Sequence, residues 1–381
     1  MFRKLPLLTC FLLLFVFTFG CTKKAEQQEY ITIGVLLPLT GEGSDEGLRA
    51  LNGLQLAKEE INKSGGILGK ILDVIVLNDR GDEEYVVQQY NALKERGVVA
   101  IIGSSYSSVT MALARAAEKD GMPIISPTAS NPDVTIGRPN VFRAIFIDDY
   151  QAEVMAHFAY NSINARTAVI LKNTGKNSYG QITEPFAESF TANGGQIIAT
   201  ELYSPGDNFA SILGKYAAEP PDLFYCPEKF IPAANLVNAA YETGLHNTYI
   251  LGSDAWDGLL AYVYQPEAME KVYYPASFSF DDKDEIVAQF VRNYFSFFSQ
   301  MPLTGSATAY TSVYILAEAI KKAGNTKSDD IVSAIKSNEL DMITGRIQFD
   351  ENNNPRPNLY ILKIKNGIYA TYEKISLQRR K

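Results

Sequence analysis

Three hydroxyl side chains follow two short apolar runs in the first half of the chain. Ser107 opens an amphipathic stretch that predicts a helix, and Thr128 and Ser130 come after the next run. A hydroxyl beside the free N–H groups of a helix N-terminus can bind an anion such as a carboxylate. The alternative is local, with Ser107 as a helix cap and Ser126-Pro127 as a turn.

A single carboxylate, Asp254, follows the apolar run 249–251, which predicts a strand. A carboxylate shielded from water needs a positive partner, and a ligand's ammonium group would serve. The alternative is a solvated loop acid or a helix cap ahead of Trp256. Trp256, the only tryptophan, and Tyr106 are candidates for the apolar walls of a site or for core positions.

The residue patterns of common enzyme classes are absent from the sequence. It has no Gly-x-Ser-x-Gly elbow and no Walker loop, and its two histidines, His157 and His246, have no cysteine or carboxylate cluster at ligand spacing. Gly41, Gly43 and Gly47 follow a predicted strand, but their acidic neighbours would repel a pyrophosphate. We therefore expect no catalysis, no cofactor and no metal site.

The N-terminal segment 1–20 has the layout of a secretory signal, with two basic residues before an apolar run over 7–19. Cys21 stands at the cleavage point, which favours lipidation; the alternative is a plain signal peptide with an incidental cysteine. Residues 21–29 are polar and predict a flexible tether. Cys226 would then have no intramolecular partner, so the exported chain must rely on its core.

Length and charge narrow the classes of function. The chain has 381 residues, and about 360 remain without the signal, a natural length for two lobes. Hydrophobic residues make up 46%, which is ordinary for a globular protein with a sizeable core. The 35 basic and 43 acidic side chains give a net charge of −8, so we expect no binding to nucleic acid.

Apolar runs alternate with amphipathic stretches from residue 30 onward, which predicts an α/β fold of parallel sheets flanked by helices. A second series begins near Phe146, so the two halves look like two copies of one architecture. The end of the chain, 345–373, alternates like a hairpin, with turn residues at 352–355 and 366–367. The expected strands are 31–37, 72–77, 98–102, 123–125, 167–171, 196–202, 223–226 and 249–251. The expected helices are 45–63, 83–96, 107–119, 151–161, 179–192, 209–217, 232–243, 285–298, 307–323 and 328–337.

Nine short segments occur in the order typical of one family. They are GVLLPLTG at 34–41, NGLQLAKEEIN at 52–62, GGILG at 65–69, IGSSYSS at 102–108, ISPTASNP at 125–132, SYG at 178–180, GSDAWD at 252–257, YILAEAI at 314–320 and FD at 349–350. With these segments in register, the chain resembles the type I periplasmic substrate-binding proteins. Within them it is similar to the branched-chain amino-acid (Leu/Ile/Val) binding group of ABC importers.

The resemblance implies two lobes joined by three crossovers, with a ligand held in the cleft between them and hinge closure around it. By that pattern lobe 1 comprises 30–146 and 277–343, and lobe 2 comprises 147–276 and 344–378. It also implies an exported monomer that passes an amino acid or similar small amphiphile to an ABC permease in the membrane. The same fold serves receptors, so the alternative is a sensor that passes its occupancy to a separate signalling partner.

The resemblance also assigns roles to the polar residues introduced above. Ser107, Thr128 and Ser130 correspond to positions that hold the zwitterionic head of an amino acid. Asp254 corresponds to an acid in close relatives, which would pair with the ligand's ammonium group.

Two further positions follow from the resemblance. Tyr179 matches a tyrosine that contacts the ligand from the second lobe. A second such tyrosine aligns with Lys229 or Phe230 here. Lys229 in the pocket would favour an acidic or longer ligand, whereas Phe230 would keep the pocket apolar.

Overall fold

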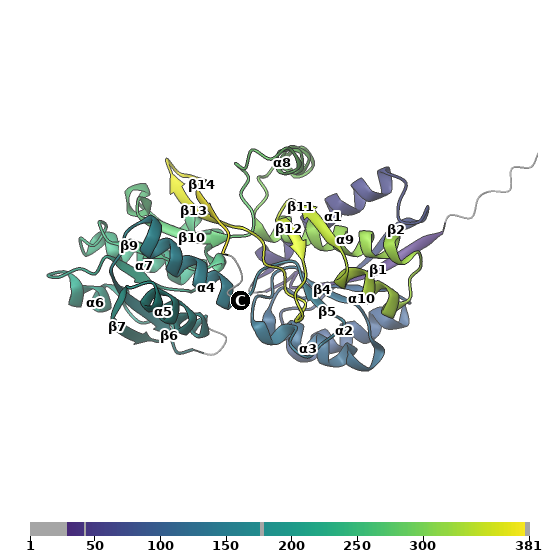
Figure 1. The fold of residues 1–381 in the computed structure, drawn as a ribbon, viewed down its shortest axis with the longest axis horizontal. Helices are drawn as coiled ribbons and strands as arrows, with labels where there is room; N and C mark the ends of the chain where they lie inside the picture. Colours follow the sequence, from purple (N-terminus) through teal and green to yellow (C-terminus); the bar gives the residue numbers. More distant parts are fainter. Residues whose placement is uncertain (1–28, 42, 176–178, 378–381) are drawn as a thin grey trace, which may run out of the picture.

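Two separate β-sheets form the centres of two lobes that lie side by side (Figure 1). The computed structural model describes residues 29–41, 43–175 and 179–377. We call the five-stranded sheet with its helices the first lobe, and the seven-stranded sheet with its helices the second lobe. The α/β class predicted from the alternating pattern is confirmed.

The first lobe has a sheet of order β2-β1-β3-β4-β5, in which every pairing is parallel. A parallel sheet needs helices on both faces, and this lobe draws its helices from two separate stretches of the chain. Its strands are β1 (Tyr30–Leu37), β2 (Ile71–Asn78), β3 (Ile101–Gly103), β4 (Ile124–Ser126) and β5 (Val141–Arg143). Its helices are α1 (Ser44–Lys63), α2 (Glu83–Glu95), α3 (Ser107–Ala117), α8 (Glu285–Phe298), α9 (Thr304–Ala323) and α10 (Ser328–Lys336).

The second lobe has a mixed sheet of order β14-β13-β10-β9-β8-β6-β7, with the C-terminal hairpin added antiparallel at one edge. Its strands are β6 (Thr167–Asn173), β7 (Gln196–Tyr203), β8 (Leu223–Tyr225), β9 (Tyr249–Leu251), β10 (Val272–Ala276), β13 (Leu359–Lys365) and β14 (Ile368–Ile375). Its helices are α4 (Asp148–His157), α5 (Thr183–Ala192), α6 (Phe209–Leu213) and α7 (Phe230–Glu242). The remaining hairpin, β11 (Glu339–Met342) and β12 (Gly345–Gln348), forms a two-stranded sheet of its own.

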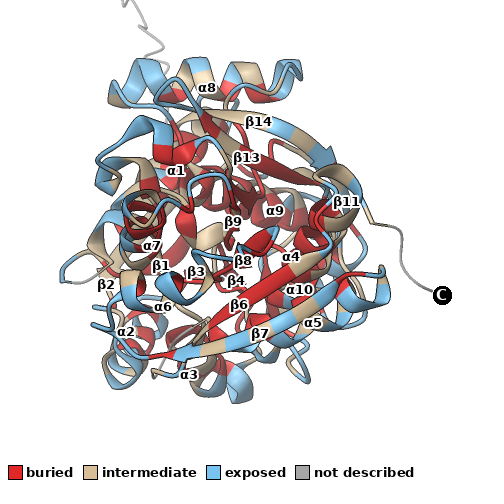
Figure 2. Ribbon diagram, turned by 90° about the vertical axis from the view of Figure 1, so that its left-hand side faces the viewer, coloured by how far each residue is buried: buried red, intermediate tan, exposed pale blue. Residues whose placement is uncertain are grey.

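Each sheet is buried on both faces because alternate side chains of a strand point to opposite sides. In the first lobe Ile33 packs with Leu54 of α1 and Leu316 of α9, whereas Leu36 packs on the other face with Leu93 of α2. In Figure 2 the central strands are largely buried, whereas the edge strands β7 and β14 and the outer faces of the helices are intermediate or exposed. This two-sided core fixes the position of the strand ends. The residues of the candidate site lie directly after those strand ends.

Helix α1 begins at a glycine that no other residue could replace without strain. Gly43 has a φ of 83°, and a Cβ there would fall 1.5 Å from the hydroxyl oxygen of Tyr106. The acids Asp45 and Glu46 in the first turn suit the positive end of the helix dipole. The glycine-rich loop therefore brings the start of α1 against the aromatic ring that precedes α3.

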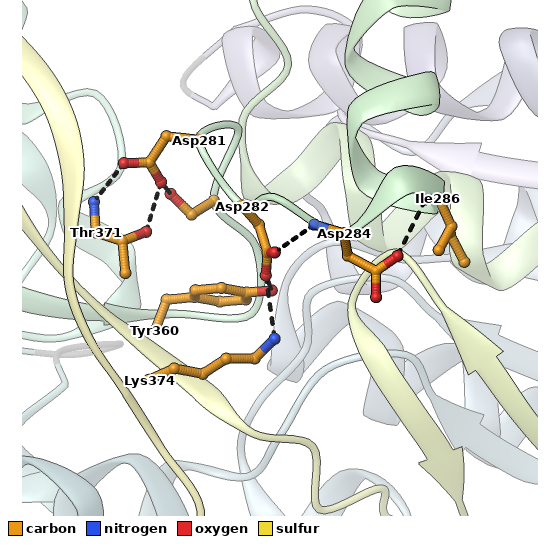
Figure 3. Close-up of polar contacts among 8 residues, drawn as sticks. Asp281, Asp282, Asp284, Ile286, Tyr360, Thr371 and Lys374 are labelled. Atoms are coloured by element: carbon orange, nitrogen blue, oxygen red, sulfur yellow. Dashed lines mark hydrogen bonds and ion pairs between the residues drawn. The ribbon is translucent and has the colours of Figure 1, made fainter.

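The chain passes between the lobes three times. It first leaves the first lobe between β5 and α4, and it returns between β10 and α8. The second crossing is tied to the C-terminal hairpin (Figure 3): Asp281 accepts hydrogen bonds from the backbone and hydroxyl of Thr371, at 3.0 and 2.6 Å, and Asp282 accepts from Tyr360 and Lys374. This linker is therefore anchored to the second lobe before α8 begins.

The third crossing lies later than the expected position near Thr344. Ile347 belongs to the core of the first lobe, and the ring of Phe349 packs edge-on against Phe142 at 5.2 Å. Asn353 donates a hydrogen bond to the carbonyl of Val141 at 3.0 Å. Residues 345–354 thus pack on the first lobe, because their side chains complete its core and cap β5, and the chain crosses between 355 and 358.

The prediction of a hairpin over 345–373 is confirmed only in part. Strands β13 and β14 pair through the turn at Asn366-Gly367, as the alternation predicts. Strand β12 pairs instead with β11, which precedes it, and the turn at 351–353 lies on the first lobe before the third crossing. Pairing with the preceding strand is favoured because the connection from Met342 to Gly345 is very short.

Candidate functional site

Ser107 is the first residue of α3, just beyond the carboxyl end of β3, as predicted. It does not cap the helix: the cap position is Tyr106, which makes no side-chain capping bond. The Ser107 hydroxyl instead accepts a hydrogen bond from the backbone N–H of Asn131, at 3.2 Å. It therefore joins the start of α3 to the loop after β4.

Thr128 and Ser130 both direct their hydroxyls at protein carboxylates. Thr128 Oγ1 lies 3.0 Å from Glu46 Oε1 and 3.0 Å from the carbonyl of Ser105. Ser130 is buried, and its side chain hydrogen-bonds to Asp148, whose backbone N–H donates back to the Ser130 carbonyl at 2.9 Å. A hydroxyl has one hydrogen to donate, so Thr128 divides its hydrogen between Glu46 and the Ser105 carbonyl, and Ser130 gives its hydrogen to Asp148.

Asp254 is neither a solvated loop acid nor a cap, since the cap of the short turn Asp254–Trp256 is Ser253. Its Oδ1 is buried and has no hydrogen-bond partner among the described residues. Burial, and after it the nearby negative charge of Asp148, raise the pKa of Asp254 to about 7. A buried carboxylate oxygen in negative surroundings is a site for a cation or a proton.

Gln151 holds Asp254 and Asp148 together. Its side-chain carbonyl accepts from the Asp254 N–H at 3.0 Å, and its amide group donates to Asp148 Oδ1, also at 3.0 Å. Burial raises the pKa of Asp148, although hydrogen bonds from Ser130 and Gln151 and the charge of Arg143 oppose that change. The two acids thus share one rigid polar bridge from helix α4.

Arg143 provides the positive charge nearest to Asp148. It is fully buried at the end of β5 and donates to the carbonyls of Ala129 and Asn131 at 2.8 and 2.9 Å. Burial lowers its pKa to about 10, while the charge of Asp148 acts in the opposite direction. Arg143 therefore shapes the loop that carries Ser130.

Charges of acids from both lobes act on the Tyr179 hydroxyl. Burial raises its pKa well above the ordinary value, and the charges of Asp254, Glu46 and Asp148 add to that shift. Glu46 starts α1 in the first lobe, whereas Asp254 belongs to the second. The Tyr179 hydroxyl therefore remains protonated, and it is a donor at the junction of the lobes.

Tyr106 and Lys229 meet across the same junction. The Nζ atom of Lys229, which precedes α7, lies 5.5 Å from the centre of the Tyr106 ring. The ring also packs beside Gly81, where a Cβ would lie 2.9 Å from a ring carbon. Tyr106 is thus a half-buried wall residue of the first lobe that a cation of the second lobe faces.

Trp256 and Phe230 pack mainly within the second lobe. Trp256 is fully buried in its core, with the ring so close to Gly252 that a Cβ there would lie 2.0 Å from a ring carbon. Phe230, the first residue of α7, packs against Tyr262 with the ring centres 5.5 Å apart and the rings tilted by 39°. Trp256 is a core residue and not a wall, because its ring fills the core under the turn. Phe230 is half-buried beside Gly258, which Arg49 of the first lobe also approaches.

Three residues of the junction were not predicted: Glu46, Asp148 and Gln151. A signal existed for Glu46, since it is one of the acids that interrupt the glycine-rich loop. Asp148 and Gln151 follow β5, a strand of three residues that carries no periodic signal.

Within the described part of the chain, no cluster of three or more histidine, cysteine or acidic side chains could hold a metal ion. Nor does any helix there have the length and apolar character needed to cross a membrane. Cys21, Ser178 and the signal segment 1–20 lie outside the described residues.

The sequence profile of the family described as periplasmic binding protein matches residues 30–368. This chain belongs to the periplasmic binding protein family. More closely, it is of the type I branch that includes the Leu/Ile/Val-binding proteins, so the resemblance drawn from the nine segments is confirmed. Membership of the family implies an exported, periplasmic location.

Known relatives cover nearly the whole chain. The Leu/Ile/Val-binding protein BraC3 of Rhizobium johnstonii is 28% identical over 84% of this chain and 88% of its own length. The leucine-binding protein LivK of Thermotoga maritima is 27% identical, with a TM-score of 0.81, over 91% of this chain and 99% of its own. LivJ of Streptococcus pneumoniae, solved with isoleucine, is also 27% identical, with a TM-score of 0.83 over the same shares. The two-lobed fold with three crossovers is therefore confirmed.

Proposed function

We propose that this periplasmic binding protein binds a free amino acid between its lobes. The observation that carries the proposal is the buried Oδ1 of Asp254, which has no hydrogen-bond partner in the described part of the chain. A ligand ammonium group would supply both the missing donor and the missing positive charge. The relatives described above as Leu/Ile/Val-binding or leucine-binding proteins, and LivJ with its bound isoleucine, support the same class of ligand.

The ligand carboxylate would bind at the N-terminus of α3. Ser107 accepts a hydrogen bond from Asn131, so its own hydroxyl hydrogen can be donated to the ligand, beside the first N–H groups of the helix. We give Thr128 and Ser130 a different role from that implied by the resemblance. Because their hydroxyls go to Glu46 and Asp148, they position these acids around the site.

The bound amino acid would then be passed to an ABC permease. The two lobes would close around the ligand, with loops of both lobes in contact with it. The closed protein would differ in shape from the empty protein, and the permease could recognise that difference. A monomer suffices for this cycle, with the lobes divided at the crossings described above. Because the protein acts by capture and release, it needs no catalytic group.

We also propose that Cys21 carries a lipid and that 21–29 tether the protein to a membrane. The support is the sequence layout of 1–20 together with the exported location of the family. Labelled palmitate should enter the wild-type chain and not the Cys21→Ser variant, which should move from the membrane to the soluble fraction. Equal labelling and equal fractionation of the two proteins would rule out the anchor.

Isothermal titration calorimetry on the chain lacking residues 1–21 tests the binding function. The ligands are a panel of α-amino acids, with the amine-free and carboxyl-free analogues of the best binder. The loss of one charge-assisted hydrogen bond costs roughly 1.5–3 kcal/mol, so Asp254→Asn should weaken binding about 10- to 100-fold. Asp329→Asn on the exposed surface of α10 makes the same change of charge and should bind like wild type.

Two outcomes would count against the proposal. One is a failure of every α-amino acid to bind to folded protein. The other is unchanged affinity in Asp254→Asn, which would show that the ammonium group is held elsewhere.

A further inference from the structure

The first lobe contains a cavity of about 510 Å³ that shares no residue with the site between the lobes. It lies where α1, α8, α9 and the hairpin strand β11 meet (Figure 1). A concave site of this size, lined by apolar and aromatic side chains with a few polar groups, is typical of binding sites for small molecules. The cavity has no part in the proposed function, so a ligand bound here would be a second one.

Glu60 of α1 is a half-buried carboxylate of this cavity, and its described hydrogen-bond donors are all neutral. Asn293 of α8 donates to Oε1 at 2.6 Å. The hydroxyls of Tyr310 and Tyr314, both on α9, donate to Oε2 at 2.5 and 3.2 Å. Because all three groups donate, Glu60 accepts on both oxygens and carries a negative charge. A carboxylate has about four acceptor positions, so Oε1 can accept from a further donor.

Three aromatic rings, of Phe290, Tyr310 and Tyr314, form one wall of the cavity. The ring centre of Tyr310 lies 4.8 Å from that of Phe290 and 4.8 Å from that of Tyr314. Phe290 and Ile343 belong to the small core that α8 shares with α1 and α9, which holds the wall in place. Aromatic faces attract cations, and the two tyrosine hydroxyls connect this wall to Glu60. The wall and the carboxylate thus favour the same kind of ligand.

The other charged side chains of the cavity are Asp341 and Lys63, both exposed. The Nζ atom of Lys63 lies 5.3 Å from the centre of the Phe297 ring, which is not part of the lining. A bound anion would therefore be repelled by Glu60 and Asp341. A neutral apolar molecule would remove water from Glu60 and return no hydrogen bond. An ammonium group on an apolar body supplies both the positive charge and the donor.

We propose that this cavity is a second binding site, which takes a small organic monocation with an ammonium group on an aromatic or alkyl body. The ammonium group would donate to Glu60 Oε1, and the body would lie against the aromatic wall with Met342 beside it. The two acids and one base of the lining leave one negative charge, which a monocation balances. This inference is independent of the proposed function, because no residue of the amino-acid site takes part.

Calorimetry on the chain lacking residues 1–21 compares phenethylamine and butylamine with two matched probes, the neutral phenethyl alcohol and the anionic phenylacetate. Wild type should bind both amines, phenethylamine more tightly, and the two matched probes at least about tenfold more weakly. Glu60→Gln removes the charge and should weaken phenethylamine binding about 10- to 100-fold. Glu95→Gln, at the exposed end of α2, makes the same change of charge and should bind like wild type.

Two variants of Ile286 supply a second measurement that a fold defect cannot imitate. This side chain lines the cavity, is 40% exposed and lies in the first turn of α8. Ile286→Lys should weaken phenethylamine binding and Ile286→Glu should strengthen it, each about two- to fivefold. Circular dichroism and the melting temperature of each variant would verify that it is folded.

Several outcomes would overturn the second site. They are absence of binding by both amines, equal binding of the amine and the alcohol, unchanged affinity in Glu60→Gln, and shifts in the two Ile286 variants that are absent or of the same sign. A loss of binding in Asp254→Asn with full binding in Glu60→Gln would also overturn it, because the cation would then lie between the lobes. Amino-acid binding is measured separately with the panel described above, so either proposal can fail without the other.

Discussion

Asp254 carries a carboxylate that is unfavourable in its surroundings, although the backbone at this position is held in place. Its carboxylate is partly removed from water and repelled by Asp148 and Glu46, which destabilises the charged form. At the same time its backbone N–H donates to Gln151, which fixes the backbone at this position. A group that costs stability in the empty protein and gains a partner from a ligand is typical of a binding site.

Replacement of Asp254 by asparagine should raise the melting temperature by a few degrees at pH 8. Because the pKa is about 7 in the folded protein and 3.8 in its unperturbed state, folding favours the protonated form. The folded protein therefore loses stability relative to the variant as the pH rises through about 7, and the two should converge near pH 4. Thermal melts by circular dichroism over this range measure the difference. A variant that melts lower than wild type at pH 8 would contradict this account.

Amino-acid binding should weaken as the pH falls from 8 to 6. The ammonium group must displace the proton that Asp254 holds below a pH of about 7, so the affinity should drop by up to about tenfold per pH unit there. Calorimetry in two buffers of different ionisation enthalpy would detect the released proton. The Asp254→Asn variant should lose this pH dependence, and a wild-type affinity that stays constant over the range would be inconsistent with the assignment.

Cys226 should resist alkylation as long as the protein is folded. Burial raises the pKa of its thiol to about 12, and the side chain packs in the core of the second lobe next to the Tyr203 hydroxyl, at 3.6 Å. Iodoacetamide at pH 8 should modify the chain lacking residues 1–21 only after urea has unfolded it. Mass spectrometry gives the number of alkylated cysteines directly. Rapid labelling of Cys226 without urea would show that the second lobe opens locally.

At the scale of elements, the link between β10 and α8 is held by side chains rather than by regular structure. Asp281 and Asp282 bind residues of β13 and β14, and Asp284 caps α8 through the N–H of Ile286 at 3.1 Å (Figure 3). Three acids in one short segment thus set the point at which the chain leaves the second sheet.

Asp282→Ala should lower the free energy of unfolding by roughly 1–3 kcal/mol, because Tyr360 and Lys374 lose their acceptor. Burial raises the pKa of Asp282, but these bonds and the N–H of Asp284 prevail and hold it below the usual 3.8. Its contribution is thus present above pH 3.8 and lost as the pH falls through the folded-state value. Urea titration at pH 7 measures the change, with Glu219→Ala on an exposed loop as the control; equal midpoints would refute the anchoring role.

Long elements could be predicted from their periodicity, and short ones could not. The helices 45–63 and 285–298 are found within one residue of their predicted bounds. Strand β10 was missed because Val272–Ala276 is short and contains Pro275, which argues against an internal strand. Its position between β9 and β13 depends on a pairing with residues far along the chain.

At the scale of the whole molecule, the lobes touch through polar contacts. The N–H of Thr304, at the start of α9, donates to Asp257 Oδ2 of the second lobe at 2.8 Å. Arg49 of α1 approaches Gly258, and its charge opposes the effect of burial, which raises the pKa of Asp257. Polar contacts of this kind form and break at little net cost, which suits lobes that move.

Asp257→Ala should favour separation of the lobes in the absence of ligand, because Thr304 loses its acceptor across the junction. We expect a larger radius of gyration by small-angle X-ray scattering, recovery with saturating amino acid, and an affinity about three- to tenfold weaker. Asp254→Asn is the comparison, since it weakens binding without removing this contact. An unchanged radius and an unchanged affinity would show that Asp257 does not hold the lobes together.

The sequence by itself determined the α/β class and the family, and it supplied the first candidates for the site. These depend on local features: hydrophobic periodicity, and polar residues such as Ser107 and Asp254 directly after strands. The strands bring such residues to a common edge wherever the sheet is parallel. No information about the partner lobe is needed for that step.

Only the tertiary structure decided which groups face one another across the junction. That Lys229 reaches over Tyr106 depends on how three crossings place one lobe against the other, whereas the bond of Thr128 to Glu46 and the burial of the Trp256 ring depend on packing within each lobe. Contacts between residues more than a hundred positions apart follow from packing of the whole molecule, because local sequence fixes the direction of a side chain but not what lies opposite it.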